Sequence, residues 1–485
     1  MNRPGRSWHS CDVAPPHPRS LRLAAARALR STAPPTQPIA LTGADGVDES
    51  HARAVLDLTL RVGEALLSTG ATASDVTATV LRLAAAYGVT SVHVDVTFTS
   101  ITVSQHRGHD QDPLTVMRIV KARTADYTRL ENLHQLVRAA TDGDLDLAAA
   151  RRRLDGIVRA PHPYRRWLVT AALAGMGASV AALFGGGLVL VLLTAATTAV
   201  IDRVQRSLAR KGLPAFFTQV VGAAIPTLVA VGLLLLVSRT NLRLEDLPPS
   251  LVVATGIIVL LAGLSVVGAA QDALEGYYVT AGARGFEVLV LTLGIVVGVA
   301  VVLALASRAG VPMALSTTTQ LSANLVVQLV ASTAVAGCFA ASAYAGLRAS
   351  LVAAGIGALG WVTFSTASTL GAGPAAASAC AAAVVGMLAQ VVAERLRVPA
   401  LAVTTAGIVP LLPGLAVYRG LFQLVDPAPM SGLATGLTTL FGAAGVGMGL
   451  AIGVSLGTYA GRPLRSRMDR WQRRALRPSR ADARE

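Results

Sequence analysis

Helical and strand periods are clearest between residues 46 and 160 of the sequence. Apolar residues over 55–67 recur with the period of a helix, which Gly70 ends. A second helical pattern begins at Ser74 and runs to Tyr87, and Gly88 follows it. A glycine directly after a helical pattern is typical of a helix C-terminus. The pattern therefore predicts two consecutive amphipathic helices.

The residues after these helices predict a small sheet. Valine and phenylalanine occupy every second position of residues 91–100, with His93 and Asp95 between them, which indicates a half-buried strand. Further strands are predicted at 101–104 and 114–120, and amphipathic helices at 128–141 and 146–158. We expect residues 46–160 to form an α+β domain of about 110 residues, large enough for its own core.

From residue 167 the alternation gives way to long apolar runs without charge. A bilayer core of about 30 Å requires about 20 apolar residues per helix. Two runs are long enough to be split, one at Gly185–Gly187 and one at Gly371–Pro374. The predicted spans are 167–184, 187–203, 214–237, 251–270, 287–306, 323–343, 349–368, 374–393, 399–418 and 434–458.

Composition agrees with this division. The chain is 53% hydrophobic and 14% charged, well below the quarter typical of soluble proteins. Residues 167–461 hold only 20 of the charged residues. The predicted fold class is therefore a polytopic α-helical membrane protein of about ten spans with a small N-terminal α+β domain. Residues 1–45, rich in proline and arginine, are predicted to be disordered, and 461–485 to form a basic tail.

Arginine and lysine predict the orientation in the membrane. With the N-terminal domain inside, cytoplasmic loops carry eight of these residues and outer loops four, Arg419 among them. We therefore expect a multi-pass protein of the plasma membrane with both termini in the cytoplasm. Basic clusters at 151–166 and 462–484 are expected to contact anionic lipid headgroups. No aromatic and basic module accompanies the charge, which argues against nucleic acid as a partner.

Ten spans permit two halves of five with inverted topology, a common transporter plan. Residues 213–228 resemble residues 398–412, but these segments lie in the third and ninth spans, an offset that does not fit two halves of five. One glycine-rich segment predicts close helix packing. It has a glycine at every fourth position: Gly445, Gly449, Gly453 and Gly457.

Breaks and polar stretches within the apolar region are the candidate substrate contacts. Prolines in a span free backbone groups, which must face protein or a water-filled cavity. A simple kink, or an ordinary outer loop for the polar stretch, is the alternative. The candidates are Pro226, Thr317, Thr318, Thr319, Gln320, Asn324, Gln328, Pro410, Pro413 and Gly414.

Carboxylates next to the spans are the candidate proton carriers, because a charge near lipid is costly and usually functional. Asp272 and Glu275 are three residues apart and share a helical face. Asp202 and Glu287 are the other two candidates. The alternative role is an interfacial ion pair with Arg203 or Arg284.

A catalytic role for the N-terminal domain is the main competing hypothesis. His93, Asp95 and four nearby residues could suggest a metal site, but their spacing matches no zinc pattern. Those four are His106, His109, Asp110 and Asp112. No phosphate-binding Gly-x-x-x-x-Gly-Lys-Ser/Thr loop occurs, so no ATP site of this type is expected. We expect neither a cofactor nor a resident metal.

Three longer segments resemble the threonine/serine exporter (ThrE) family. The first joins 61–75 to 86–100, with Tyr-Gly-Val-Thr-Ser before the predicted strand. The others are 271–284, Gln-Asp-Ala-Leu-Glu-Gly-Tyr-Tyr-Val-Thr-Ala-Gly-Ala-Arg, and 405–414, Thr-Ala-Gly-Ile-Val-Pro-Leu-Leu-Pro-Gly. The resemblance covers about residues 50–460. It implies an actinobacterial exporter of small hydroxy amino acids.

The sequence hypothesis is thus a secondary transporter and not an enzyme. It would be an antiporter that exports L-threonine and L-serine, with proton entry down the proton motive force. Two alternatives stay open: an exporter of another small metabolite such as a carboxylate, and a membrane-anchored hydrolase with its site near His93. Assembly into a homo-oligomer also stays open.

Overall fold

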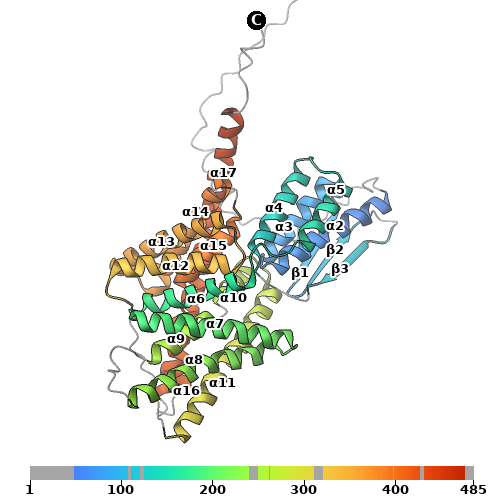
Figure 1. Ribbon diagram of the computed structural model, residues 1–485. Coiled ribbons are helices and arrows are strands. Elements are labelled where there is room, and N and C mark those ends of the chain that lie inside the picture. Colours follow the sequence, from blue (N-terminus) through green and yellow to red (C-terminus); the bar gives the residue numbers. More distant parts are fainter. Residues whose placement is uncertain are drawn as a thin grey trace, which may run out of the picture.

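A computed structural model describes most of the chain in one arrangement (Figure 1). The described residues are 48–107, 111–120, 125–239, 249–260, 263–310, 321–396, 398–425 and 431–475. The N-terminal segment predicted to be disordered lies outside these ranges, as do residues 476–485 of the predicted tail.

The N-terminal region, residues 48–160, has the elements that the sequence pattern predicts. They are α2 (Glu49–Ser68), α3 (Ala73–Ala86), β1 (Val92–Thr97), β2 (Ser100–Gln105), β3 (Leu114–Ile119), α4 (Tyr127–Thr141) and α5 (Leu147–Arg159). The strands form one antiparallel sheet in the order β1-β2-β3. Helix α3 begins one residue earlier than predicted, because Thr72 is its N-cap and accepts a hydrogen bond of 3.3 Å from the Asp75 amide.

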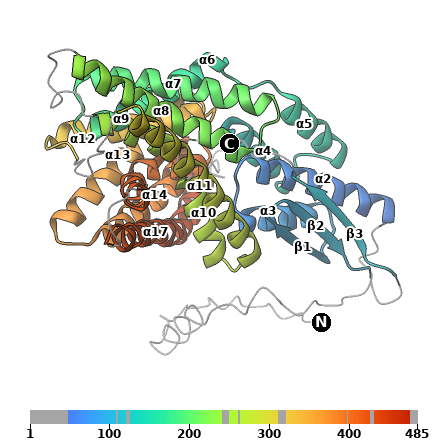
Figure 2. The ribbon, with the colours of Figure 1, turned by 90° about the horizontal axis from the view of Figure 1, so that it is seen from below.

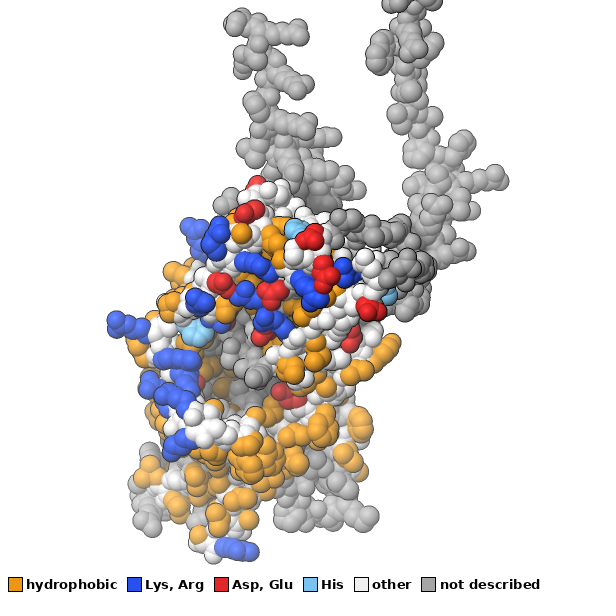
Figure 3. Space-filling model, turned by 90° about the vertical axis from the view of Figure 1, so that its right-hand side faces the viewer, with side chains coloured by type: hydrophobic (Ala, Val, Ile, Leu, Met, Phe, Trp, Pro, Cys, Tyr) orange, Lys and Arg blue, Asp and Glu red, His pale blue; other side chains and the backbone are white. Residues whose placement is uncertain are grey.

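The core of this region lies between the helices and one face of the sheet. Ile101 and Val103 of β2 are fully buried, and α2 packs against this strand. A Cβ at Gly63 of α2 would lie 3.1 Å from Val80 and 3.3 Å from Ile101, so helix and sheet are in close contact there. Charged side chains gather on the outer surface of the region (Figure 3), where Arg118 forms ion pairs with Asp57 and Glu64.

The rest of the described chain is a bundle of long apolar helices. Its elements are α6 (Arg166–Leu183), α7 (Leu188–Arg210), α8 (Ala215–Arg239), α9 (Pro249–Leu260), α10 (Gly263–Leu274), α11 (Tyr278–Arg308), α12 (Leu325–Ser342), α13 (Leu347–Thr369), α14 (Pro374–Leu396), α15 (Ala400–Ile408), the short 3-10 helix η2 (Val409–Leu411), α16 (Gly414–Val425) and α17 (Ser431–Ala475). Eight helices are long and apolar enough to cross a membrane, and two bent pairs raise the number to ten if each pair is one span.

The surface of the bundle matches a membrane environment. Large hydrophobic side chains such as Leu188, Phe286 and Phe441 are two thirds or more exposed. Figure 3 shows hydrophobic side chains spread over the bundle below the charged N-terminal region. A soluble surface rarely exposes apolar area on this scale. The fold is therefore a multi-pass helical membrane protein with a small N-terminal sheet region, as the sequence predicts.

The last five spans repeat the packing of the first five. In the first half, α6 packs on α7, α8 on both α9 and α11, and α10 on α11. In the second half, α12 packs on α13, α14 on both α15 and α17, and α16 on α17. The halves also contact each other through α6 and α12. Residues 213–228 and 398–412, which resemble each other in sequence, do not occupy corresponding places in this arrangement.

Glycines make the same close contact in each half. A Cβ at Gly298 of α11 would lie 2.2 Å from the Val220 carbonyl oxygen of α8. A Cβ at Gly453 of α17 would lie 2.2 Å from the Ala379 carbonyl oxygen of α14. Such distances exclude a side chain, so only glycine permits this helix separation. The ridge of α17 begins at Gly449, because Gly445, which the sequence pattern includes, meets open space.

Candidate functional site

The fourth and ninth spans, which occupy corresponding places in the two halves, are both bent. The pair α9 and α10 bends by 41° between Leu260 and Leu264, so the fourth span is not the single helix that the sequence predicts. The Gln219 side chain donates a hydrogen bond of 3.1 Å to the Leu260 carbonyl at this break. The ninth span bends by 48° between Leu411 and Gly414. Backbone groups released at such breaks are suited to binding small polar ligands.

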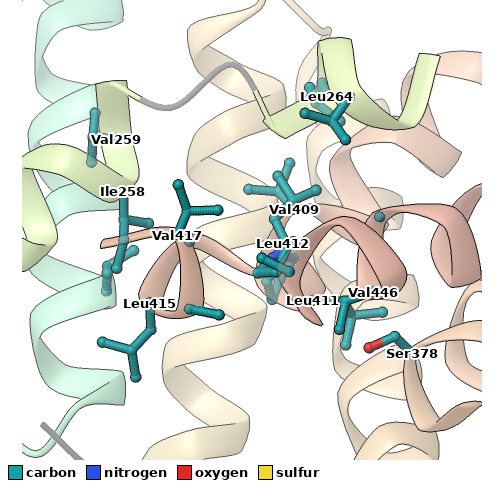
Figure 4. A pocket seen from close by; sticks show the side chains of 18 of the residues that line it. Ile258, Val259, Leu264, Ser378, Val409, Leu411, Leu412, Leu415, Val417 and Val446 are labelled. Atoms are coloured by element: carbon teal, nitrogen blue, oxygen red, sulfur yellow. The ribbon is translucent and has the colours of Figure 1, made fainter. Parts of the chain in front are cut away.

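A cavity of about 830 Å³ lies between the two breaks. Figure 4 shows Ile258 and Val259 of α9 on one side, Leu264 of α10 above, and Val409 to Leu415 of the ninth span between them. The breaks touch directly, because a Cβ at Gly414 would lie 2.9 Å from Ile258. Cavities of this size bind small molecules in many proteins. The contact between the breaks means that movement of one span changes the cavity wall formed by the other.

Three of the predicted substrate contacts line the cavity: Pro410, Pro413 and Gly414. Pro226 does not line it. Pro226 lies inside α8 against α9, where a Cβ at Gly256 would be 2.5 Å from the proline ring. This close packing favours the alternative role of Pro226, a kink in a packed helix, over a substrate contact.

The polar stretch before α12 has a mainly structural role where it is described. The Asn324 side chain caps α12 by accepting a hydrogen bond of 2.9 Å from the Val326 amide. Gln328 donates to the Ser322 carbonyl at 2.6 Å and accepts from Trp361 Nε1 at 3.2 Å. Trp361 lines the cavity, so Gln328 is one contact away from it. Thr317, Thr318, Thr319 and Gln320 lie outside the described residues.

Four polar residues of the cavity wall were missed by the sequence analysis. They are Ser265, Thr292, Ser378 and Arg419. The sequence assigned Arg419 to an outer loop, whereas it belongs to α16 and lines the cavity. The assignment was wrong because the predicted ninth span ended at 418, one residue before Arg419. An arginine at the end of an apolar run with a proline break was the signal that could have identified it.

Asp272 does not line the cavity; it lies where the N-terminal region meets the bundle. Its side chain is completely buried, and Oδ2 lies 2.9 Å from Nη1 of Arg284. The Ala73 amide at the start of α3 donates to Oδ1 at 3.2 Å. Arg284 also donates to the Ala71 carbonyl at 3.4 Å. A helix N-terminus carries partial positive charge, so α3 and Arg284 both stabilise the carboxylate.

Glu275 belongs to the same contact, because Ser74 Oγ of α3 donates to its carboxylate. We call Ala71, Ala73, Ser74, Asp272, Glu275 and Arg284 the α3–α10 junction. The hydroxyl of Thr280 adds a hydrogen bond of 3.0 Å to the Val96 carbonyl of β1. The junction thus connects the N-terminal region to α10, whose other end lines the cavity.

The N-terminal region contacts the second half through α4. The Tyr127 amide donates to the Ala343 carbonyl at 2.9 Å, and the Tyr127 hydroxyl lies 2.6 Å from Thr405 Oγ1 of α15. Burial raises the pKa of Tyr127 to about 12, so its hydroxyl keeps its proton at neutral pH. Thr128 also donates to the Tyr344 carbonyl at 2.5 Å. The N-terminal region therefore contacts both halves.

The remaining candidate carboxylates lie elsewhere. Asp202 of α7 accepts from Thr170 Oγ1 at 2.7 Å and pairs with Arg206 at 2.5 Å. Its partner is thus not Arg203, the residue named in the sequence alternative. Glu287 is exposed on α11. None of the four candidate proton carriers lines the cavity.

The histidines of the N-terminal region do not form a metal site within the part of the chain that the structure describes. No group of three or more His, Cys, Asp or Glu could hold a metal ion among these residues. His93 and His106 lie edge to face with ring centroids 5.4 Å apart. His109 and Asp110 are outside the described residues.

Two repeated halves of membrane-spanning helices, with a cavity between two broken spans, define the class of membrane transporters. The comparisons give the family. A family model described as "Putative threonine/serine exporter" matches residues 57–306, and one described as "Threonine/Serine exporter, ThrE" matches residues 324–456. The first match ends with α11 and the second begins with α12, at the boundary between the two halves.

Two curated relatives agree. A protein of Mycobacterium tuberculosis (strain ATCC 25618 / H37Rv) named "Probable threonine/serine exporter" is 42% identical over 429 residues, which cover 87% of this chain and 79% of the relative. The "Threonine/serine exporter" of Corynebacterium glutamicum is 35% identical over 436 residues, which cover 89% of this chain and 87% of the relative. No solved structure matches the chain. The chain belongs to the threonine/serine exporter family, and it is a transporter rather than an enzyme.

Proposed function

We propose that this protein exports L-threonine and L-serine across the plasma membrane, driven by the proton motive force, with the cavity as its substrate site. The observation that carries the proposal is the meeting of two broken spans, at corresponding places of two repeated halves, around a cavity of about 830 Å³. The names of the two relatives support the substrates. Of the substrate contacts that the sequence predicts, Pro410, Pro413 and Gly414 line the cavity, and we propose them as substrate contacts.

Transport would proceed by alternating access, in which one half rocks against the other around the site. Asp272 and Glu275 are the proposed coupling groups, although they lie away from the cavity. A proton on Asp272 would remove its charge attraction to Arg284, 2.9 Å away, and weaken the α3–α10 junction. Because α10 lines the cavity at Ser265, a freed α10 could change access to the site. Asp202 and Glu287 are weaker candidates, since Asp202 is paired with Arg206 of its own helix and Glu287 is exposed.

Both termini are proposed to be cytoplasmic. The N-terminal region and the C-terminal end of α17 lie on the same side of the bundle (Figure 1). This placement supports an even number of spans. The view from below (Figure 2) shows the N-terminal region beside the bundle, next to α10 and α11. Such a position suits a region that senses or gates the cytoplasmic entrance.

A small carboxylate is the second candidate substrate. Within the described part of the chain, the cavity wall holds one arginine and no aspartate or glutamate. An amino acid carries an ammonium group that an acidic side chain often binds, whereas a carboxylate needs only the cation. This favours keeping small carboxylates in the substrate screen.

The test is threonine efflux from cells preloaded through a threonine-containing dipeptide, with and without an uncoupler. Faster efflux with the protein present, lost on adding the uncoupler, is expected. Faster efflux that the uncoupler leaves unchanged would refute proton coupling while keeping the substrate. Unchanged efflux would refute the threonine assignment, and serine and small carboxylates would then be measured in the same cells.

A further inference from the structure

We propose that Arg419 is the specificity residue of the cavity and binds the carboxylate of the transported amino acid. The inference rests on the proposed function and adds a named group for substrate recognition. It starts from the position of Arg419 on α16, four residues after Leu415, so that both side chains lie on one helical face. Leu415 and Arg419 both line the cavity, and Figure 4 shows Leu415 beside it.

The chemistry of the wall indicates which ligand group Arg419 meets. Valine, leucine and phenylalanine make up most of the lining, and Ser265, Thr292 and Ser378 add hydroxyl groups. Arg419 is the one charged residue of the lining among the residues that the structure describes. A guanidinium in such surroundings forms short, often bidentate hydrogen bonds with a carboxylate.

The location in the break strengthens this inference. Helix α16 begins at Gly414, and its N-terminal end lies in the same cavity wall as Arg419. The partial positive charge of a helix start favours an anion nearby. The charge of Arg419 and the helix start of α16 therefore both favour a negatively charged group of the ligand.

Among the described residues, the first half contributes no charged side chain to the cavity wall. Its broken span places Asp272 and Glu275 at the far end of α10, in the junction with α3, and its arginine, Arg284, is paired there at 2.9 Å. Neither Asp272 nor Arg284 lines the cavity. Among the described residues of the cavity wall, the charged group therefore comes from the second half.

The experiment uses the full-length protein in liposomes and measures counterflow of labelled L-threonine. Unlabelled competitors are L-threonine, its methyl ester, which lacks the carboxylate, and 3-hydroxybutyrate, which lacks the ammonium. With the wild type, we expect threonine to compete and the ester to require at least about tenfold higher concentration, equivalent to 1.4 kcal/mol. We expect Arg419→Gln to lose at least about tenfold in counterflow, and Arg419→Lys to keep part of it. Arg308→Gln, an exposed arginine at the end of α11, is the matched control and should be unchanged.

Thermal unfolding in detergent establishes that each variant is folded. Wild-type rates in folded Arg419→Gln, with the ester still excluded, would overturn the role of Arg419. If Arg419→Gln does not fold, the wild-type competition decides, because an ester that competes as well as threonine overturns carboxylate recognition. Absence of threonine counterflow in the wild type would instead overturn the proposed function and this inference together. Competition by 3-hydroxybutyrate as strong as by threonine would support Arg419 and favour small carboxylates as substrates.

Discussion

The two halves of the bundle share their packing but differ in what their broken spans carry. Gly298 in the first half and Gly453 in the second make the same contact with a carbonyl of the neighbouring helix. Gly298 and Gly453 therefore mark corresponding positions, and the residues fourteen positions before them, Arg284 and Thr439, also correspond. Arg284 pairs with Asp272 of α10, whereas Thr439 donates a hydrogen bond of 3.0 Å to Gln423 of α16.

One position thus holds an ion pair in the first half and a neutral hydrogen bond in the second. The ion pair of Asp272 and Arg284 contacts the N-terminal region at Ala73 and Ala71. The described hydrogen bond between Thr439 and Gln423 lies within the bundle. The second half instead places a cation in the cavity, at Arg419. We propose a division of roles on this basis: the first half connects the cavity to the N-terminal region through the charged α3–α10 junction, and the second half supplies the cation of the cavity wall.

The largest effect is expected from breaking the ion pair. Asp272→Ala leaves Arg284 buried without its carboxylate, which should lower the free energy of unfolding by about 3–5 kcal/mol. The double variant Asp272→Gln with Arg284→Thr reproduces the Gln423 and Thr439 pair of the second half, and its free energy of unfolding should fall clearly less. Unfolding in mixed detergent micelles measures both. A double variant as unstable as Asp272→Ala would contradict the correspondence of the two positions.

Packing of the repeated glycines comes next. Gly453→Ala and Gly298→Ala should each lower the free energy of unfolding by about 1–3 kcal/mol, because the added carbon meets a backbone oxygen at 2.2 Å. Gly445→Ala is the control, since it meets open space, and it should be neutral. The same micelle titration applies. Equal stability of Gly445→Ala and Gly453→Ala would show that the ridge contact is not as close as described.

The contact between the breaks should affect transport more than stability. Gly414→Ala places a carbon 2.9 Å from Ile258 and should slow threonine counterflow several-fold, since an overpacking cost of about 1 kcal/mol corresponds to roughly fivefold. Adding Ile258→Ala removes the obstructing atoms and should restore part of the rate. A double variant slower than Gly414→Ala alone would argue against a direct contact during transport.

The smallest effect is expected at the edge of the junction. Glu275→Gln and Ser74→Ala each alter one hydrogen bond at a half-buried carboxylate, with an expected cost of about 0.5–1.5 kcal/mol. If they act through the same bond, the double variant should cost less than the two single changes together. Full additivity in a double-mutant cycle would separate the two residues.

Local patterns predicted the elements well. The alternation of Val92, Val94 and Val96 identified β1, because one face of the strand is buried and the other is polar. The helices and spans were predicted for the same reason: burial and lipid each impose a simple period or a minimum length. Residues 410–414 could also be assigned to the cavity, because prolines inside an apolar run are visible in sequence.

The remainder depends on contacts between distant segments. Asp272 was expected near lipid, but its partner Ala73 lies 199 residues earlier in the sequence. The break before Leu264 was missed because residues 251–270 carry no charge and no proline marks the bend. Arg419 was assigned to a loop because the uncharged run ends at Tyr418, and hydropathy alone does not say that a charged side chain can face a cavity within a span.

The central claim is that the cavity between the breaks binds the substrate, and protection of cysteines from labelling tests it most directly. Cys11, Cys338 and Cys380 are replaced by alanine, and Ser265→Cys or Ser378→Cys is introduced into the cavity wall, with Ser307→Cys at the exposed end of α11 as control. Each variant is first tested for threonine counterflow, then treated with a small thiol reagent. We predict that threonine slows labelling at 265 and 378 and leaves 307 unchanged. Labelling at both cavity positions that threonine does not slow, in variants that still transport it, would contradict the account.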